Sequence, residues 1–94
     1  MIHPKLQVVT LTAANTEYSV EFADRTKKIM IKGRTNAVIR IAWETGKVAT
    51  PTDPYLTIAS GVVWYENDLQ LNYGTKLYLA SPNAGLVVEV ASYD

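Results

Sequence analysis

The sequence predicts an all-β fold, namely a single small β-sandwich of about eight short antiparallel strands with a jelly-roll-like or other Greek-key topology. Three observations predict this fold. Short segments alternate apolar with polar side chains, as strands with one buried face do. Turn-forming glycine, proline, asparagine and aspartate residues separate these segments. No stretch spaces its apolar residues three and four apart for long enough to form a helix.

Residues 6–12 form the first predicted strand, and the stretch TEYSVEFADRTKKIMIKGR (residues 16–34) predicts a β-hairpin with its turn at residues 23–26. Folding the two halves against each other places Glu17 opposite Lys32 and Glu21 opposite Lys28. Opposite charges directly across an antiparallel pair contribute about 0.2–1 kcal/mol each. The charges are therefore expected to set the register, while the other side supplies a core face. The apolar pairs on that side are Tyr18 with Ile31 and Val20 with Ile29.

A second hairpin is predicted for KLYLASPNAGLVVEV (residues 76–90), because SPNA at residues 81–84 suits a type I turn with proline at its second position. In this register Lys76 meets Glu89, and Tyr78 meets Val87, on the outer side. The inner side pairs Leu77 with Val88 and Leu79 with Leu86. This hairpin, like the first, is expected to lie within one sheet.

The other predicted strands lie between the two hairpins, at residues 37–44, 55–58, 62–66 and 69–71, and residues 45–54 form a surface loop with two prolines. Such strands without helices are typical of a β-sandwich or a small barrel. Residues 1–94 are expected to form one domain, with residues 1–5 as a mobile N-terminal tail. Tight hairpins favour a meander within one sheet, whereas a jelly roll sends many consecutive strands to opposite sheets. The sequence leaves both arrangements open.

The composition is that of an ordinary globular domain of 94 residues, with 48% hydrophobic and 19% charged residues. Nine basic and nine acidic residues cancel, so no net charge attracts nucleic acid or anionic lipid. The absence of cysteine excludes a disulfide framework and a thiolate metal site, and it favours a reducing compartment. Neither a signal peptide nor an apolar run long enough to cross a bilayer is recognisable. We therefore expect a protein made in the cytoplasm, without a membrane partner.

Residues suited to catalysis or metal binding are sparse. The single histidine, His3, lies beside Pro4 near the N-terminus, where a solvated tail residue is expected. Glu66, Asp68 and Asp53 could offer oxygen ligands to a hard cation such as calcium, but the spacing of a calcium-binding loop is absent and a solvated turn is expected. No catalytic, cofactor-binding or metal site is assigned, no cofactor is expected, and the chain is not expected to be an enzyme.

Basic residues are concentrated in one part of the chain, where they could form a patch for phosphate or an acidic partner. The simpler interpretation is that Glu17 and Glu21 neutralise two of the lysines across the hairpin. No aromatic residue interleaves the basic run, as single-strand binding would require, so a nucleic-acid partner is not expected. The basic residues are Arg25, Lys27, Lys28, Lys32, Arg34 and Arg40.

The aromatic residues are more informative. Trp43 continues the alternation of Ile39 and Ile41 and is expected in the core. If Glu66 points to solvent, Trp64 shares its outer face, whereas Val63 and Tyr65 point inward. Large apolar residues on outer faces suggest a protein interface, although a loop could equally fold over them. The candidate interface residues are Met30, Val62, Trp64, Tyr78 and Val87.

The succession of TEYSVEF, KKIMIKGR, YLTIASG and KLYL resembles small all-β bacteriophage virion proteins, namely head-decoration and tail- or connector-associated β-sandwich modules. In that group a polar-Tyr-x-apolar strand, a turn and a strand ending in Lys-x-Arg precede Tyr-x-Thr-Ile-x-x-Gly and Lys-x-Tyr-Leu segments. The resemblance covers the chain from about residue 16 onward. It implies a structural role in the virion, usually as an oligomer assembled in the host cytoplasm, and it transfers no catalytic residue.

Three classes of function are therefore considered. The first is a non-enzymatic structural protein of a bacteriophage particle, a head-decoration or head/tail accessory protein. It would form a homo-oligomer, most simply a trimer or dimer, and dock on the repeating lattice of phage capsid or tail proteins. The second is a carbohydrate-binding β-sandwich module that stacks sugar rings on Trp64, Tyr65, Tyr55 or Tyr73. The third is a small hydrolase or isomerase.

Overall fold

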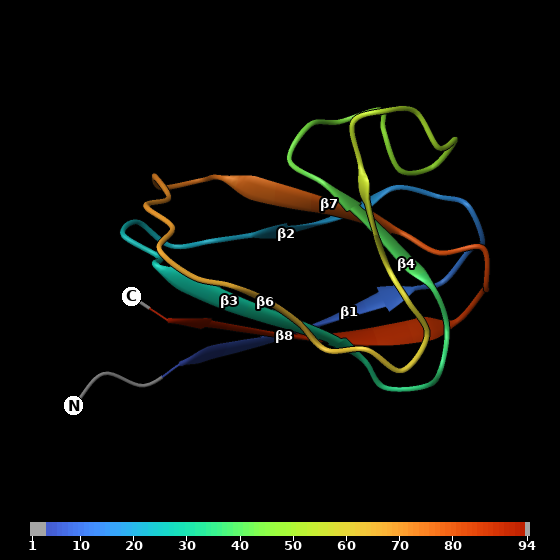
Figure 1. Cartoon of the computed structure of the whole chain (residues 1–94), viewed down its shortest axis with the longest axis horizontal. Coiled ribbons are helices and arrows are strands. Elements are labelled where there is room, and N and C mark those ends of the chain that lie inside the picture. The colour runs from blue at the N-terminus through green and yellow to red at the C-terminus, as the bar shows by residue number, and fades with distance from the viewer. Residues whose placement is uncertain (1–3, 94) are drawn as a thin grey trace.

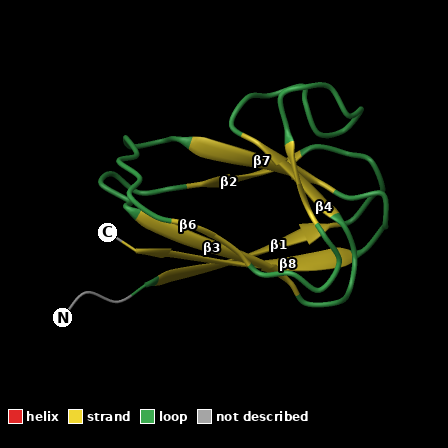
Figure 2. Cartoon of the chain, in the orientation of Figure 1, coloured by secondary structure: helices red, strands yellow, loops and turns green. Residues whose placement is uncertain are grey.

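The computed structural model describes residues 4–93, whose regular secondary structure consists entirely of β-strands (Figure 2). The all-β prediction is confirmed. No helix that could span a membrane occurs within this range. The eight strands are β1 (Lys5–Leu11), β2 (Tyr18–Glu21), β3 (Lys28–Gly33), β4 (Ile39–Ala42), β5 (Leu56–Ile58), β6 (Trp64–Glu66), β7 (Lys76–Ala80) and β8 (Leu86–Tyr93).

The strands form two four-stranded antiparallel sheets that pack face to face (Figure 1). The first, here called sheet A, has the order β1-β8-β3-β6, and the second, sheet B, has the order β2-β7-β4-β5. Within this order the first strand pairs with the last, the second with the seventh, the third with the sixth and the fourth with the fifth. This is the order of a jelly roll, in which a long antiparallel ribbon is rolled into two layers. The predicted sandwich is therefore confirmed, and its topology is settled.

Both predicted hairpins are wrong. β2 and β3 lie in different sheets, as do β7 and β8, so each connecting turn carries the chain across the sandwich. Lys32 is paired in register with Glu89, and Glu21 with Lys76, in place of the predicted partners. In these four strands the alternation predicts which side chains face inward, but it specifies nothing about which strands are neighbours. Two strands can both direct their apolar side chains into the core whether they lie in opposite sheets or beside each other in one sheet.

The core lies between the sheets and uses the inward-facing residues that the alternation predicted. Ile29 and Ile31 from sheet A and Leu77 and Leu79 from sheet B are each 0% exposed. Phe22, directly after β2, is 1% exposed and adds the aromatic ring of this cluster. The other buried members are Leu11, Val20, Ile39, Ile41, Ile58, Leu86, Val88 and Val90.

The connection between β4 and β5 folds back over the outer face of sheet B (Figure 1). Val48, from this loop, is 0% exposed and packs with Ala42 and Ala80. Arg40 holds the loop in place, since its Nε donates to the Val48 carbonyl at 2.8 Å. Its Nη2 donates to Asn15 Oδ1 at 2.8 Å, and to the Ala49 carbonyl at 3.4 Å. The predicted surface loop is thus a packed cover for this sheet.

Several predicted boundaries need correction. Residues 69–71 are not a strand, although the side chains of Leu69 and Leu71 pack against the core. Lys5 is the first residue of β1, so the predicted tail does not extend to it. His3 lies outside the described residues. Trp43 follows the end of β4 and is 41% exposed, with its ring centroid 6.2 Å from that of Phe22, so the prediction that it lies in the core is wrong.

Candidate functional site

The strand register of sheet A brings a set of outward-pointing side chains onto one surface. Their neighbours along each strand face the core, because successive side chains of a strand point to opposite sides. We call this surface the outer face of sheet A. Its members are Leu6, Val8 and Thr10 from β1, Lys28, Met30 and Lys32 from β3, Tyr65 from β6, and Val87, Glu89, Ala91 and Tyr93 from β8.

An apolar row crosses all four strands of this face. Leu6 is paired with Ala91, Ala91 with Met30, and Met30 with Tyr65. Leu6 is 76% exposed and Tyr65 is 55% exposed, while Met30 is half-buried. Val8, in the next row, is 59% exposed. The row therefore presents apolar side chains to solvent at Leu6 and Tyr65 and in part at Met30, while Ala91 between Leu6 and Met30 is 2% exposed.

One side of the apolar row is bordered by Lys28, which lies between Tyr65 and Tyr93. The ammonium of Lys28 lies 5.7 Å from the centroid of the Tyr65 ring and 5.3 Å from that of the Tyr93 ring. A cation within about 6 Å of an aromatic face is attracted by the ring quadrupole. This contact draws Lys28 towards the aromatic rings of β6 and β8, so the positive charge borders the apolar row.

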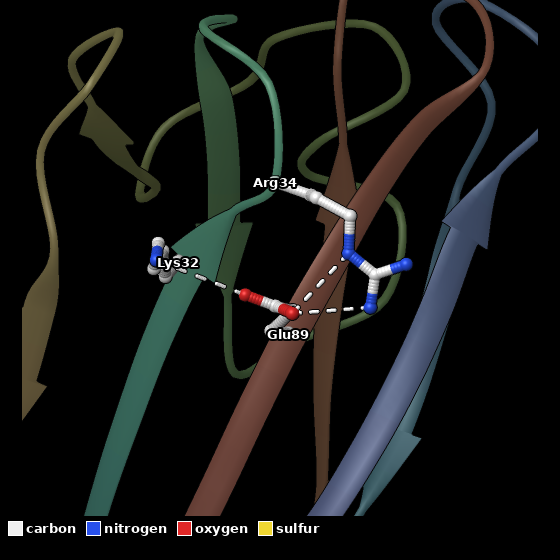
Figure 3. Close-up of polar contacts among 3 residues, drawn as sticks. All are labelled: Lys32, Arg34 and Glu89. Carbon is white, nitrogen blue, oxygen red and sulfur yellow. Dashed lines mark hydrogen bonds and ion pairs between the residues drawn. The ribbon is translucent and has the colours of Figure 1, made fainter.

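The other side of the row is bordered by an ionic cluster centred on Glu89 (Figure 3). Arg34 donates from Nε at 3.2 Å and from Nη2 at 3.0 Å to Glu89 Oε2. The Nζ of Lys32 lies 3.9 Å from Glu89 Oε1. These side chains are 38–54% exposed, so the pairs add little to stability but give the face a polar rim.

We expect the Arg34→Gln and Glu89→Gln substitutions to show a coupling of about 0.5 kcal/mol in the free energy of unfolding, because these side chains interact directly. A double-mutant cycle measured by urea denaturation checks this value. Glu17 and Lys32 provide the control cycle and should show none, because Glu17 accepts hydrogen bonds from Thr45 Oγ1 at 2.6 Å and Gly46 N at 2.8 Å. Coupling in the control cycle alone would contradict the strand order.

The predicted interface residues do not form one surface. Met30 and Val87 lie on the outer face of sheet A, whereas Tyr78 lies on the outer side of sheet B and packs against the cluster around Val48. Val62 is 49% exposed in the connection between β5 and β6. The prediction that Tyr78 and Val87 are cross-strand neighbours is therefore wrong. The loop cover considered as an alternative occurs at Tyr78.

The predicted orientations of Trp64 and Tyr65 are reversed. Trp64 is paired with the fully buried Ile31 and packs against the core, while Tyr65 is paired with Met30 on the outer face. The prediction assumed that Glu66 marks the solvent side. Glu66 is paired with the buried Ile29 at the edge of the sheet, where a long polar side chain on the core side can still reach water.

Sequence reasoning also missed Leu6 and Val8 as surface residues. In the segment LQVVTL both alternate sets contain apolar residues, so its pattern does not identify the buried side. The structure identifies the buried side, because Leu11 is 0% exposed whereas Val8, on the other side of the strand, is 59% exposed.

The basic residues are dispersed by the fold. Arg40 is buried under the β4–β5 loop, Lys28 lies over two rings, and Arg34 and Lys32 surround Glu89. Arg25 and Lys27 line a shallow depression with Asp68, Leu69 and Gln70. Glu17 and Glu21 do not neutralise the lysines of β3, contrary to the prediction. The patch of six basic residues is therefore not formed.

A small apolar pocket of about 230 Å³ lies at the border of sheet B. Trp43, Tyr55 and Leu56 contribute its apolar surface, and Glu44 contributes a carboxylate. Its remaining lining residues are Ile41, Ala42, Pro54 and Leu77. Across residues 4–93, no three histidine, aspartate or glutamate side chains come together as metal ligands, and this includes Asp53, Glu66 and Asp68.

Comparisons of the chain with protein-family models, with curated protein sequences and with solved structures found no significant match.

Proposed function

We propose that this chain is a non-enzymatic structural protein of a bacteriophage particle, either a head-decoration or a head/tail accessory protein. It associates with itself and docks on a repeating lattice of capsid or tail proteins, after assembly in the host cytoplasm. The apolar row across sheet A, with Leu6 76% exposed, is the observation that supports a docking role. The phage assignment itself rests on the sequence resemblance.

The chemistry of the outer face of sheet A suits a protein partner. Methionine and tyrosine are enriched in protein interfaces, and a polar rim commonly surrounds an apolar centre. Met30 and Tyr65 lie in the apolar row, and Lys28 and Glu89 border it on opposite sides. Sheet B offers no comparable face, because the loop around Val48 covers its centre. Docking through sheet A therefore makes use of the uncovered side of the sandwich.

Phage particles banded in a density gradient are expected to contain this chain in a fixed number of copies, measured by quantitative mass spectrometry. Particles assembled with the Tyr65→Glu variant should lose the chain, because the substitution places a charge in the apolar row. The control is Tyr73→Glu, which makes the same change at a tyrosine that is 82% exposed outside the outer face. Absence of the wild-type chain from particles, or full incorporation of Tyr65→Glu, would contradict the proposal.

A carbohydrate-binding module is the second candidate, and the pocket beside sheet B favours it. Trp43, 41% exposed, and Tyr55 line this pocket together with Glu44, so a sugar ring could stack on an aromatic face near a hydrogen-bond acceptor. Of the aromatic residues first considered for this role, Tyr55 lines the pocket, whereas Trp64 packs against the core and Tyr65 lies on sheet A. Saturable glycan-array binding that is lost in Trp43→Ala and kept in Tyr65→Ala would favour this second function.

A further inference from the structure

Strand β1 is the longest open edge of the sandwich. It forms one border of sheet A over seven residues. The other border strands are shorter, with three residues in β6, four in β2 and three in β5. A border strand leaves every second residue with an unpaired backbone N–H and C=O, which can pair with another strand. The length of β1 makes it the largest such template in this fold.

The hydrogen-bonding pattern identifies which residues of β1 face the open edge. The Arg34 amide donates to the Val87 carbonyl at 2.8 Å, in continuation of the β3–β8 register. Backbone groups of an antiparallel strand alternate between its two neighbours, so the residues of β8 opposite Gln7 and Val9 bond β1. Leu6, Val8 and Thr10 therefore direct their N–H and C=O groups outward. Within residues 4–93, no backbone hydrogen bond outside the strand ladders uses these groups.

From Leu6 onward, β1 lacks the usual protection of an edge strand. Charges, prolines and bulges discourage edge-to-edge pairing, but residues 6–11 contain neither charge nor proline, and the seven pairs with β8 are continuous. The neighbouring border strand β2 differs. Its Glu21 carbonyl accepts a hydrogen bond from Gln7 Nε2 at 3.0 Å, and Glu21 itself is charged. Of these two adjacent edges, β1 is the one open to another strand.

We propose that β1 pairs antiparallel with β1 of a second copy of this chain, with Val8 on the two-fold axis. This inference rests on the proposed function, in that it specifies how the self-association occurs. In this register Leu6 faces Thr10 of the second copy, and Val8 faces its counterpart. The outward N–H and C=O groups of Leu6, Val8 and Thr10 then all find partners. Lys5 faces Leu11, so no like charges meet.

The match of β1 with itself favours a second copy as the occupant. The outward groups have the same spacing in both copies, and a two-fold interface requires such self-complementarity. Val8, 59% exposed, would lie beside Val8 of the other copy, and Leu6, 76% exposed, would lie beside its Thr10, so both side chains lose contact with water. The two copies of sheet A would form one continuous sheet, whose joined outer faces double the surface available for docking.

The proposal is tested by light scattering after gel filtration at concentrations on the order of tens of micromolar, because oligomer populations depend on concentration. The wild-type protein is expected at twice the 10.4 kDa mass of one chain. Val8→Lys alone and Val8→Glu alone should be monomers, since like charges would meet at the axis. Mixing the two variants should restore the dimer, because opposite charges then face each other. Ser19→Lys and Ser19→Glu, at an exposed position of β2, are the controls and should remain dimers.

A wild-type monomer, a trimer, or a dimer that persists in both Val8 variants would overturn the proposal. Failure of the mixture to restore the dimer would overturn the register at Val8. Circular dichroism verifies that each variant keeps its strand content. A monomeric wild-type protein would overturn the β1 pairing, whereas the docking role of Tyr65 is tested separately by the particle experiment. Failure of this inference and failure of the proposed function are therefore distinguishable.

Discussion

Replacing Arg40 by methionine is expected to lower the free energy of unfolding by about 3 kcal/mol, because hydrogen bonds to charged groups contribute about 1.5–3 kcal/mol and their buried partners would be left unsatisfied. Arg40 is 8% exposed and donates at 2.8 Å both to the Val48 carbonyl and to Asn15 Oδ1. Methionine keeps the unbranched chain but offers no donor. Val48, which the arginine holds against the outer side of sheet B, would lose its anchor.

Urea denaturation of both proteins measures this change. The matched control is Arg34→Met, which removes a guanidinium whose side chain is 54% exposed and should cost less than about 1 kcal/mol. Equal effects at Arg34 and Arg40 would contradict the role of Arg40 as the anchor of the β4–β5 loop. A large effect at Arg40 alone would show that the cover of sheet B is part of the cooperative fold.

The Phe22→Ala substitution is expected to lower the free energy of unfolding by about 3–5 kcal/mol, the range for truncating a large buried aromatic residue. Phe22 is 1% exposed and lies where the chain leaves β2 to cross to the other sheet. Its backbone N–H donates a hydrogen bond to the Thr75 carbonyl at 2.9 Å, which fixes the position of the chain at this residue. The strand therefore cannot easily slide to bring a neighbouring side chain into the space that Phe22 fills. The loss would leave a cavity beside Trp43.

Thermal and urea unfolding of Phe22→Ala test this value. Tyr73→Ala is the control, since Tyr73 is 82% exposed and its truncation should change stability by no more than about 0.5 kcal/mol. A loss at Phe22 smaller than about 1 kcal/mol, the average for any substitution, would contradict its place in the core.

The inward and outward faces of most strands could be predicted from the sequence. Val20, Ile29, Leu77 and Val88 are buried as their alternation indicates. This works where one alternate set is clearly apolar and the other clearly polar, because a strand with one buried face must present the apolar set to the core. In residues 64–66, WYE, both sets contain an aromatic or long side chain, and the prediction for Trp64 failed.

The sites were less predictable than the faces. Leu6 and Tyr65, which dominate the apolar row on sheet A, were not among the predicted interface residues, because both alternate sets of their strands contain apolar or long side chains and only the packing of the two sheets decides which set is buried. Arg40 appeared to belong to a basic surface run. Its burial follows from the loop that returns over sheet B, a contact between segments whose sequence shows no sign of their proximity.

The sequence by itself determined that this protein is an all-β sandwich, with short strands whose apolar sides meet in one core. Only the tertiary structure decided which strands are neighbours. Lys32 could satisfy its charge with Glu17 or with Glu89, and Glu21 could pair with Lys28 or with Lys76, at similar small gains per pair. Packing the inner faces of the two sheets against each other buries many more side chains than the few that form these charge pairs. The packing of the two layers therefore selected the jelly-roll order over the hairpins. Local sequence patterns alone could not distinguish these two arrangements.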